Sequence, residues 1–421
     1  NTDNVPNNGN VIRSHVLENA SKHYVDDDDK FVEFLNSKVA FLNSMVDRIT
    51  SSRPNSNGLV PLCEPLPMKA LVICDEGRDL PSWMNDVDVQ SRFGVKIRRD
   101  PKELESDIAL KLRVANGTHT AVAHAMALLS LVNTEALSCS SSSPSSSNTI
   151  IINNYLDSLY ETQILPGAVN DGISSSETNA TWEDWRQRLR HPHFGLSTFF
   201  ITQNGAAKCG IRLGPTIKSL ILANNNDDLS ISMVFAVAVI LRFLTPASST
   251  NAAANKNLCQ RIEVTKQQQR GVYLGWLDYV DSSDTTTVTY ADGLRYNLSE
   301  GWYEFKCNCP IRATLSDKMM TLPEALSKLD AQNQLRECKE VVRSYLLHPQ
   351  GGDLHALLLE GETVEENTRR KLDTFVDAVS TLYARMVGGG DGSGISVLLR
   401  EMAEKRHVYS NGFATSCACL T

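Results

Sequence analysis

The chain has 421 residues, of which 42% are hydrophobic and 21% charged, and its formal net charge is -8. This length allows two or three domains with cores of their own, and the composition is ordinary for a globular protein. Because the charge is acidic and no basic stripe runs through the sequence, we expect no nucleic-acid partner. The longest apolar run, at 231–244, is too short to span a bilayer and contains Arg242. We interpret it as a buried core helix and expect no membrane association.

The ten cysteines show no disulfide framework. Two C-x-C pairs, at 307/309 and 417/419, lack the second pair or the histidines that complete a zinc site. We therefore expect no bound metal, reduced thiols and a cytoplasmic location. The chain starts with Asn1 instead of methionine, and its first residues lack the features of a secretory signal. We expect the N-terminus of the parent polypeptide to be missing.

In chain order, the first hundred residues predict loops mixed with short strands. The acidic run VDDDDK at 25–30 predicts a solvated loop. The run KALVICD at 69–75 is rich in branched apolar residues, which is typical of a buried strand, and GVKIRRD at 94–100 predicts another short strand.

From residue 107 onward the pattern changes to long helices, predicted at 107–133, 150–163, 229–245, 322–347 and 362–387. The serine-rich stretch 138–149 predicts a surface loop. Residues around Asp292–Gly293 alternate as in a hairpin, and Asp-Gly suits the tight turn between twisted strands, so we predict a small β insertion at about 272–312. The predicted domains are 1–105 and 106–421.

The glycine run GGGDGSG at 388–394 lacks the spacing and the lysine of a phosphate-binding loop, and it follows a helix instead of a strand. We interpret it as a flexible turn. The sequence contains no H-E-x-x-H or G-x-S-x-G motif, so it does not support simple hydrolysis.

The segment KLRVANGTHTAVAHAMALL at 111–129 is apolar, yet its start carries Lys111, Asn116 and His119. Burying such groups without partners is costly, so they either lie at a surface or meet something. On an α-helix the three lie within an arc of about 140°. An amine shielded from water can act as a general acid or base, an amide can donate to a developing alkoxide, and an imidazole can orient a hydroxyl. Together these groups suit alcohol and carbonyl chemistry.

A structural interpretation of the same segment stays open. A helix start with a snorkelling lysine and capped polar side chains requires no ligand. Spacing alone favours this interpretation over the catalytic one.

The motif K-x-x-x-x-N-x-x-H at 111–119 resembles the signature of the polyol-specific long-chain dehydrogenases and reductases. This family includes mannitol dehydrogenase and the fructuronate and tagaturonate reductases. Four further segments are similar to family segments in the same order: TDNVPNNG at 2–9, FLNSMVDRIT at 41–50, CEPLPMKALVICD at 63–75 and NGAAKCGIRLGP at 204–215. The resemblance covers residues 2 to about 215.

The resemblance implies an α/β remnant of a Rossmann-type domain, followed by a mainly α-helical C-terminal domain like that of 6-phosphogluconate dehydrogenase, here with a small β insertion. It implies metal-free hydride transfer between NAD or NADP and a secondary alcohol of a small-molecule polyol or sugar acid. It also implies site roles: Lys111 as catalytic acid/base, Asn116 and Asn4 polarising the carbonyl oxygen, His119, Lys208 and Arg212 binding substrate hydroxyl or carboxylate groups, and Asp47 lining the nicotinamide end.

Two departures from the family pattern are visible. The family's glycine-rich phosphate turn precedes the segment that 2–9 resembles, and this chain has none, so we expect it in sequence upstream. Mannitol-type members carry an arginine eight residues before Lys208, where this chain has Phe200. That difference argues against a mannitol-type enzyme. The NGTHT form at 116–120 and the Lys208/Arg212 pair resemble the tagaturonate reductases more closely.

Two hypotheses follow. The chain belongs to an NAD(P)-dependent polyol or hexonate dehydrogenase, or it is a truncated relative that serves as a binding or scaffold subunit. The sequence does not distinguish a monomer from a dimer.

Overall fold

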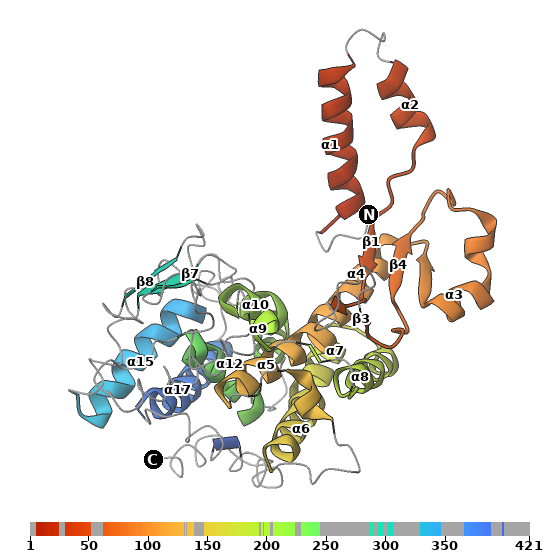
Figure 1. Ribbon diagram of the computed structural model, residues 1–421. Coiled ribbons are helices and arrows are strands. Elements are labelled where there is room, and N and C mark those ends of the chain that lie inside the picture. Colours follow the sequence, from red (N-terminus) through yellow and green to blue (C-terminus); the bar gives the residue numbers. More distant parts are fainter. Residues whose placement is uncertain are drawn as a thin grey trace. The chain divides into compact units, whose positions relative to one another are not determined.

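The computed structural model (Figure 1) describes residues 6–24, 30–51, 62–129, 131, 133–138, 147–192, 195–196, 198–202, 205–223, 229–244, 287–289, 294–297, 302–305, 329–346, 366–388 and 398–399. The chain divides into two compact units, which we describe separately. Unit 1 comprises Asn1–Lys111 and Ala180–Arg188, and unit 2 comprises Leu112–Asn179 and Leu189–Thr421. The division expected at 105/106 stays a prediction.

Unit 1 is built around a small sheet with the strand order β1-β4-β5. Strand β1 pairs antiparallel with β4, and β4 pairs parallel with β5. Strands β2 and β3 form a separate antiparallel pair. The elements are α1 (Asn8–His23), α2 (Lys30–Lys38), β1 (Ser44–Val46), β2 (Thr50–Ser51), β3 (Leu62–Cys63), β4 (Leu71–Cys74), η2 (Ser82–Asn85), α3 (Val87–Phe93), β5 (Val95–Arg98), α4 (Pro101–Leu110) and most of α8 (Ser175–Leu189). The two strands predicted at 69–75 and 94–100 are confirmed as β4 and β5.

The core of unit 1 lies between the sheet and α4. Alternate residues of β4, Val72 and Cys74, are buried together with Met45 of β1 and Leu104 of α4. Helix α3 connects the parallel strands and ends at Gly94, whose φ of 63° is left-handed. A Cβ atom at Gly94 would lie 2.4 Å from the Pro67 carbonyl oxygen, so glycine is required at this turn.

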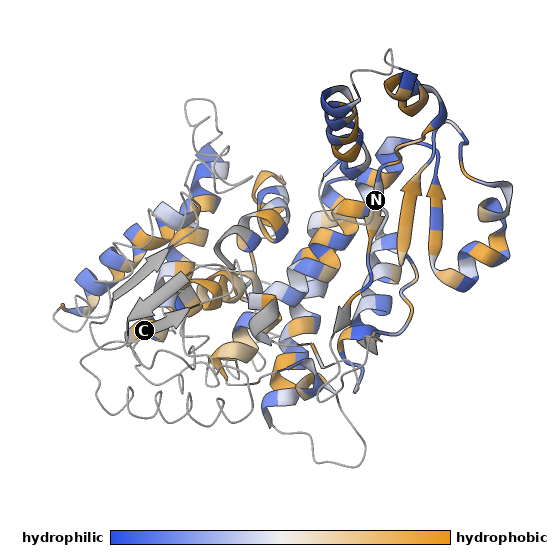
Figure 2. Cartoon of the chain, turned by 45° about the horizontal axis from the view of Figure 1, so that its top comes forward, coloured by the Kyte–Doolittle hydropathy of each residue, from blue (hydrophilic) through white to orange (hydrophobic). Residues whose placement is uncertain are grey.

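Helices α1 and α2 were not predicted, and the expectation of loops and strands for this part of the chain was wrong. Only Asn8, Gly9 and Ala20 of α1 are buried, and Figure 2 shows α1 mainly in hydrophilic colours. A helix without an apolar stripe lacks the periodicity that identifies helices in a sequence. Residues 25–29, which include the four consecutive aspartates, lie outside the described part of the chain.

Unit 2 is mainly helical. Its elements are α5 (Thr118–Leu128), η4 (Thr134–Leu137), α6 (Ser147–Leu159), η5 (Tyr160–Ile164), α7 (Leu165–Asn170), α9 (Thr198–Thr202), α10 (Gly205–Arg212), α11 (Gly214–Leu222), α12 (Ile231–Leu244), β6 (Thr287–Thr289), β7 (Leu294–Asn297), β8 (Trp302–Phe305), α15 (Ala331–Leu346) and α17 (Glu366–Gly388). The π-helical segment η3 (Lys111–Gly117) joins α4 to α5.

Two helices form the centre of this unit. Every residue of α5 is buried, and α12 is buried from 232 to 243. Helix α12 packs against α5 and α17, and α15 packs against α17 (Figure 1). The prediction of a buried core helix at 231–244 is confirmed. None of the described helices combines the length and the apolar character needed to cross a lipid bilayer.

Strands β6, β7 and β8 form an antiparallel sheet within the predicted β insertion, and Thr289 of β6 pairs with Arg295 of β7. This pairing matches the predicted hairpin, although Asp292–Gly293 itself lies outside the described residues. The C-x-C pairs and most of the serine-rich stretch also lie outside them.

Candidate active site

Lys111 and Asn116 lie on η3, which is π-helical where an α-helix was expected. A π-helix closes with i→i+5 hydrogen bonds, so residues five apart lie about one turn apart, whereas on an α-helix they would be about 140° apart. Short π-helical segments inside α-helices are frequent at functional sites. The division between the units falls directly after Lys111, so the surroundings of Lys111 belong to unit 1 and those of Asn116 and His119 to unit 2.

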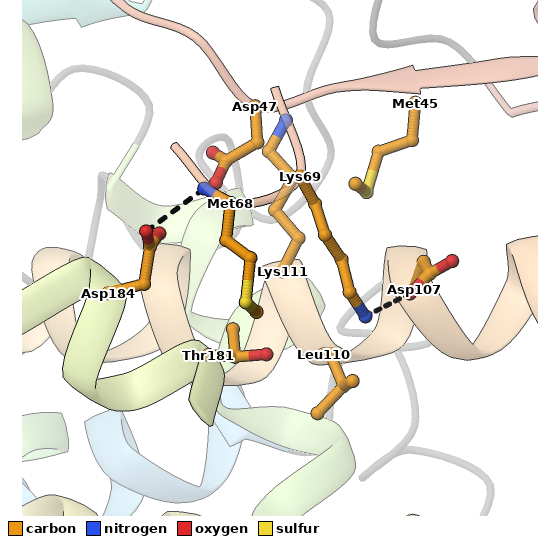
Figure 3. Close-up of a pocket in the computed structure, with 9 residues that line it drawn as sticks. All are labelled: Met45, Asp47, Met68, Lys69, Asp107, Leu110, Lys111, Thr181 and Asp184. Atoms are coloured by element: carbon orange, nitrogen blue, oxygen red, sulfur yellow. Dashed lines mark hydrogen bonds and ion pairs between the residues drawn. The ribbon is translucent and has the colours of Figure 1, made fainter. Parts of the chain in front are cut away.

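Lys111 lines a small cavity within unit 1 (Figure 3). The cavity has a volume of about 20 Å³, which is room for about one water molecule. Its lining residues are Met45, Asp47, Met68, Lys69, Asp107, Leu110, Lys111, Thr181 and Asp184. The Nζ atom of Lys111 donates a hydrogen bond to the Val46 carbonyl oxygen. Lys111 and Asp47, which come from separate motifs, thus line the same cavity.

Two of the motif segments are also tied to each other in unit 1. The side chain of Asn8 donates to the Ser44 carbonyl oxygen at 3.0 Å and accepts from the Ser44 amide at 2.9 Å. The side chain of Asn43 accepts from the Gly9 amide at 2.9 Å. These bonds fix the end of segment 2–9 at the start of β1, which leads directly to Asp47. Asn4 lies outside the described residues.

Asp47 is held by Arg188, a residue that the sequence did not reveal as part of a site. The Arg188 guanidinium lies 2.7 Å from the carboxylate of Asp47, 2.9 Å from that of Glu64 and 3.0 Å from that of Asp184. It also stacks over the Trp185 ring, with its central carbon 4.9 Å from the ring centroid. Asp184 and Arg188 are four residues apart on α8, a spacing that favours an ion pair, but this pattern is common on helix surfaces.

The Arg188 cluster also binds backbone groups and is buried. The Glu64 carboxylate accepts the Ile49 amide at 2.7 Å, and the Asp184 carboxylate accepts the Met68 amide at 3.0 Å. Burial raises the pKa of Glu64 above its ordinary value, although Arg188 and the Ile49 amide act to lower it. Burial acts to lower the pKa of Arg188, but the three carboxylates outweigh it and the pKa is raised. Arg188 therefore stays charged.

A second charged group closes the other side of the cavity. The Arg98 Nε atom donates to the Asp107 carboxylate at 2.7 Å, and Lys69 forms an ion pair with the same carboxylate (Figure 3). Asp107 is buried on α4, so water does not solvate its carboxylate. The two cations compensate its charge instead.

In unit 2, the start of α5 packs closely against α10. The Arg212 guanidinium donates to the Thr120 hydroxyl at 2.7 Å. A Cβ atom at Gly117 would lie 3.1 Å from the Arg212 carbonyl oxygen, which is a tight contact. His119 is buried on the same stretch, and Asn116 is half-buried. The predicted residues Asn116, His119 and Arg212 therefore lie on segments that unit 2 brings together.

Cations gather at this place. Burial lowers the pKa of Arg212 to about 10, and within the described part of the chain no carboxylate forms an ion pair with it. The Lys208 Nζ atom donates to the Ile201 carbonyl oxygen at 2.8 Å. Burial lowers the pKa of His124 to about 3, with the charges of Lys208 and Arg212 contributing to this shift. The local field favours an anion.

The described residues do not form a site for a dinucleotide pyrophosphate. The helices that follow the strands of unit 1 begin with acidic residues: Asp86 caps α3, which has Asp88 in its first turn, and Asp100 caps α4, which has Glu103. Such helix starts disfavour phosphate because their carboxylates already occupy the amide groups. Among the residues that the structure describes, no three His, Cys, Asp or Glu side chains gather as possible metal ligands.

Comparison with known proteins gives a weak structural likeness. No protein-family model and no curated protein matches the sequence. A crystal structure of D-sorbitol dehydrogenase in substrate-free form is similar at 18% identity and a TM-score of 0.43, over 59% of this chain and 48% of that one. The Pseudomonas fluorescens mannitol 2-dehydrogenase ternary complex with NAD and D-mannitol is similar at 16% identity and a TM-score of 0.48, over 96% of this chain and 61% of that one. The chain thus spans between about half and three fifths of the structures it matches.

Proposed function

We propose that the protein is an NAD(P)-dependent, metal-free oxidoreductase that interconverts a secondary alcohol of a polyol or sugar acid and the corresponding ketone. The observation that carries this proposal is that Lys111 and Asp47, chosen from two separate motifs, line the same cavity of unit 1. An amine and a carboxylate that line one small cavity are suited to proton transfer at a substrate oxygen.

In the proposed mechanism, Lys111 accepts the hydroxyl proton when the alcohol is oxidised and returns it when the ketone is reduced. The amides of Asn116 and Asn4 donate hydrogen bonds to the oxygen as its negative charge develops. His119 orients a neighbouring hydroxyl of the substrate. A bound nicotinamide cofactor would supply the hydride chemistry, and the residues named above would bind the substrate oxygen and handle its proton.

A sugar acid is the substrate class that we favour. Arg212 is half-buried and bonded to the neutral Thr120 hydroxyl. A substrate carboxylate would supply the charge that this guanidinium lacks within the described residues, and Lys208 would add a second donor. This argument supports a tagaturonate- or fructuronate-reductase-like enzyme over a mannitol-dehydrogenase-like one.

The cofactor, NAD or NADP, is part of the proposal, but the described residues do not accommodate it. The acidic starts of α3 and α4 offer no pyrophosphate site, and a cavity of about 20 Å³ does not admit a nicotinamide ring. Binding of the cofactor would depend on other residues. The second candidate function is a relative that keeps the site residues but acts as a non-catalytic binding or scaffold subunit.

One assay separates the two candidates. The protein produced from its complete coding sequence is incubated with NAD⁺ or NADP⁺ and with mannitol, arabinitol, altronate or mannonate, and formation of the reduced cofactor is followed by absorbance. Turnover of altronate or mannonate above that of the neutral polyols is the expected result. Absence of turnover with every pair, in a folded protein, would favour the non-catalytic candidate.

A further inference from the structure

We propose that Arg188 is a positioning residue for the Lys111 cavity: it holds the carboxylates of Asp47 and Asp184 in the cavity wall and neutralises their charge, so that Lys111 can release its proton. The importance of that proton for catalysis rests on the proposed function. The electrostatic control of Lys111 by Arg188 does not, and it can be tested without turnover.

Arg188 contacts carboxylates that line the cavity. Its three nitrogens each meet a different carboxylate, at 2.7 Å for Asp47, 2.9 Å for Glu64 and 3.0 Å for Asp184. Two of these carboxylates, Asp47 and Asp184, line the cavity together with Lys111 (Figure 3). The Arg188 side chain is 3% exposed, so its charge is poorly screened by solvent.

The charges that face Lys111 divide into two groups. On one side, the charge of Asp107 is balanced by Lys69 and Arg98. On the other side, within the described part of the chain, Arg188 is the only cation that contacts Asp47 and Asp184. Glu64, the fourth carboxylate, also pairs with Arg188 but does not line the cavity. On this second side of the cavity, the compensation of the negative charges near Lys111 therefore depends on the Arg188 guanidinium.

Loss of the Arg188 charge would leave uncompensated carboxylates beside the Lys111 amine. Nearby negative charge favours the protonated form of an amine and raises its pKa, typically by about one to three units for a close partner. A lysine held protonated cannot accept a proton from an alcohol. Arg188 thus acts on the reaction through Asp47 and Asp184, without touching the substrate.

A purely structural role for Arg188 makes a different prediction. In that case Arg188 only links α8 to β3 and to the loop after β1, and its removal lowers stability without altering the titration of Lys111. Arg188→Lys retains the charge but loses the three-way fork, whereas Arg188→Gln loses the charge. Comparing the two variants therefore distinguishes the effect of the positive charge at position 188 from the effect of the guanidinium's three-way hydrogen bonding.

The test is the pH dependence of acetylation of Lys111 by acetic anhydride in the full chain, quantified by mass spectrometry of the peptide. The half-point of labelling is expected to rise by about one pH unit in Arg188→Gln and to stay within about 0.3 units of wild type in Arg188→Lys. Arg186→Gln serves as the matched control, since Arg186 lies on the same helix but pairs with the exposed Glu183. An unchanged half-point in folded Arg188→Gln would overturn the proposal.

Asp47→Asn keeps the test decisive if Arg188→Gln does not fold, as monitored by circular dichroism. Removing this carboxylate is expected to lower the half-point of Lys111, and an unchanged half-point would overturn the proposal. If labelling shifts as expected but the protein turns over no substrate, the proposed function fails and the role of Arg188 stands.

Discussion

The Arg188 guanidinium and the Glu64 carboxylate lie 2.9 Å apart, and their side chains are only 3% and 0% exposed. The two residues are 124 positions apart in sequence, so the pair links α8 to the end of β3 within unit 1. A buried pair of this kind contributes little net stability when intact, but removing one partner leaves a charge that water does not reach.

Glu64→Ala is therefore expected to lower the free energy of unfolding by about 3 kcal/mol. Glu64→Gln is expected to lower it by about 1–2 kcal/mol, because the Ile49 amide and Arg188 donate to different oxygens of Glu64 and the single amide oxygen of glutamine keeps one of these two hydrogen bonds. Urea denaturation followed by circular dichroism measures both. Glu183→Ala, which removes an exposed carboxylate of α8, is the control and should change stability by less than about 0.5 kcal/mol. A value for Glu64→Ala within that range would contradict the prediction.

Lys111→Ala tests the proposed acid/base. It is expected to reduce kcat by about 10²- to 10⁴-fold and to leave cofactor binding nearly unchanged, because general acid/base catalysis acts on the chemical step. Stopped-flow or steady-state rates with the best substrate of the panel measure the effect. Lys102→Ala, on the exposed first turn of α4, is the matched control. Turnover of Lys111→Ala comparable to that of the control would remove Lys111 from the mechanism.

Arg212→Gln tests the preference for a sugar acid. Loss of a charged hydrogen bond to a substrate carboxylate is expected to lower kcat/KM for altronate by about 10- to 100-fold. Mannitol has no carboxylate, so its kcat/KM should change by less than about threefold. The ratio of the two values corrects for any general disturbance of the Thr120 contact. Equal losses for both substrates would show that Arg212 does not recognise the acid group.

His124 predicts a pH dependence of stability. Burial lowers its pKa from an ordinary 6.5 to about 3, so the folded protein keeps the imidazole neutral while the unfolded chain takes up a proton below about pH 6.5. The stability present above that pH is lost as the pH falls, until the folded imidazole itself is protonated near pH 3. Between about pH 7.5 and 5.5 the expected loss is about 1.4 kcal/mol.

The measurement for His124 is the difference between wild type and His124→Leu in urea denaturation across this pH range. Carboxylates titrate in both proteins, so their contribution cancels in the difference. The wild type should lose stability relative to the variant as the pH falls. Parallel curves for the two proteins would contradict a neutral, buried imidazole.

The sequence predicted the elements whose residues carry a strong local signal. The branched apolar runs at β4 and β5 identified both strands, and the uninterrupted apolar run identified α12. The amphipathic signal is weak in α1, so this helix was not predicted. Helix α2 has only nine residues and was not predicted either. The π-helical segment η3 could not be predicted either, because a segment with i→i+5 hydrogen bonds has no distinct residue pattern in the sequence.

The candidate site was predictable only where motifs mark it. Lys111 and Asp47 lie in segments that resemble a known family, and their placement on one cavity followed from the fold. Arg188 lies 141 residues from Asp47 and 124 from Glu64, so no local spacing reveals the cluster. Helical spacing links Arg188 to Asp184 alone. The roles of all the predicted site residues stay predictions: Asn4, Asp47, Lys111, Asn116, His119, Lys208 and Arg212.

Gly117 sets how near two helices of unit 2 can come. With only a hydrogen on its α-carbon, it allows the backbone of α10 to approach the first turn of α5, and even a methyl group would lie 3.1 Å from the Arg212 carbonyl oxygen. The reach from the guanidinium to the Thr120 hydroxyl depends on that approach. A bulkier residue at this position would push the two helices apart and displace the Arg212 guanidinium, which we propose binds an acid group. Few residue types would therefore be tolerated at position 117, although Gly117 itself contributes no functional group.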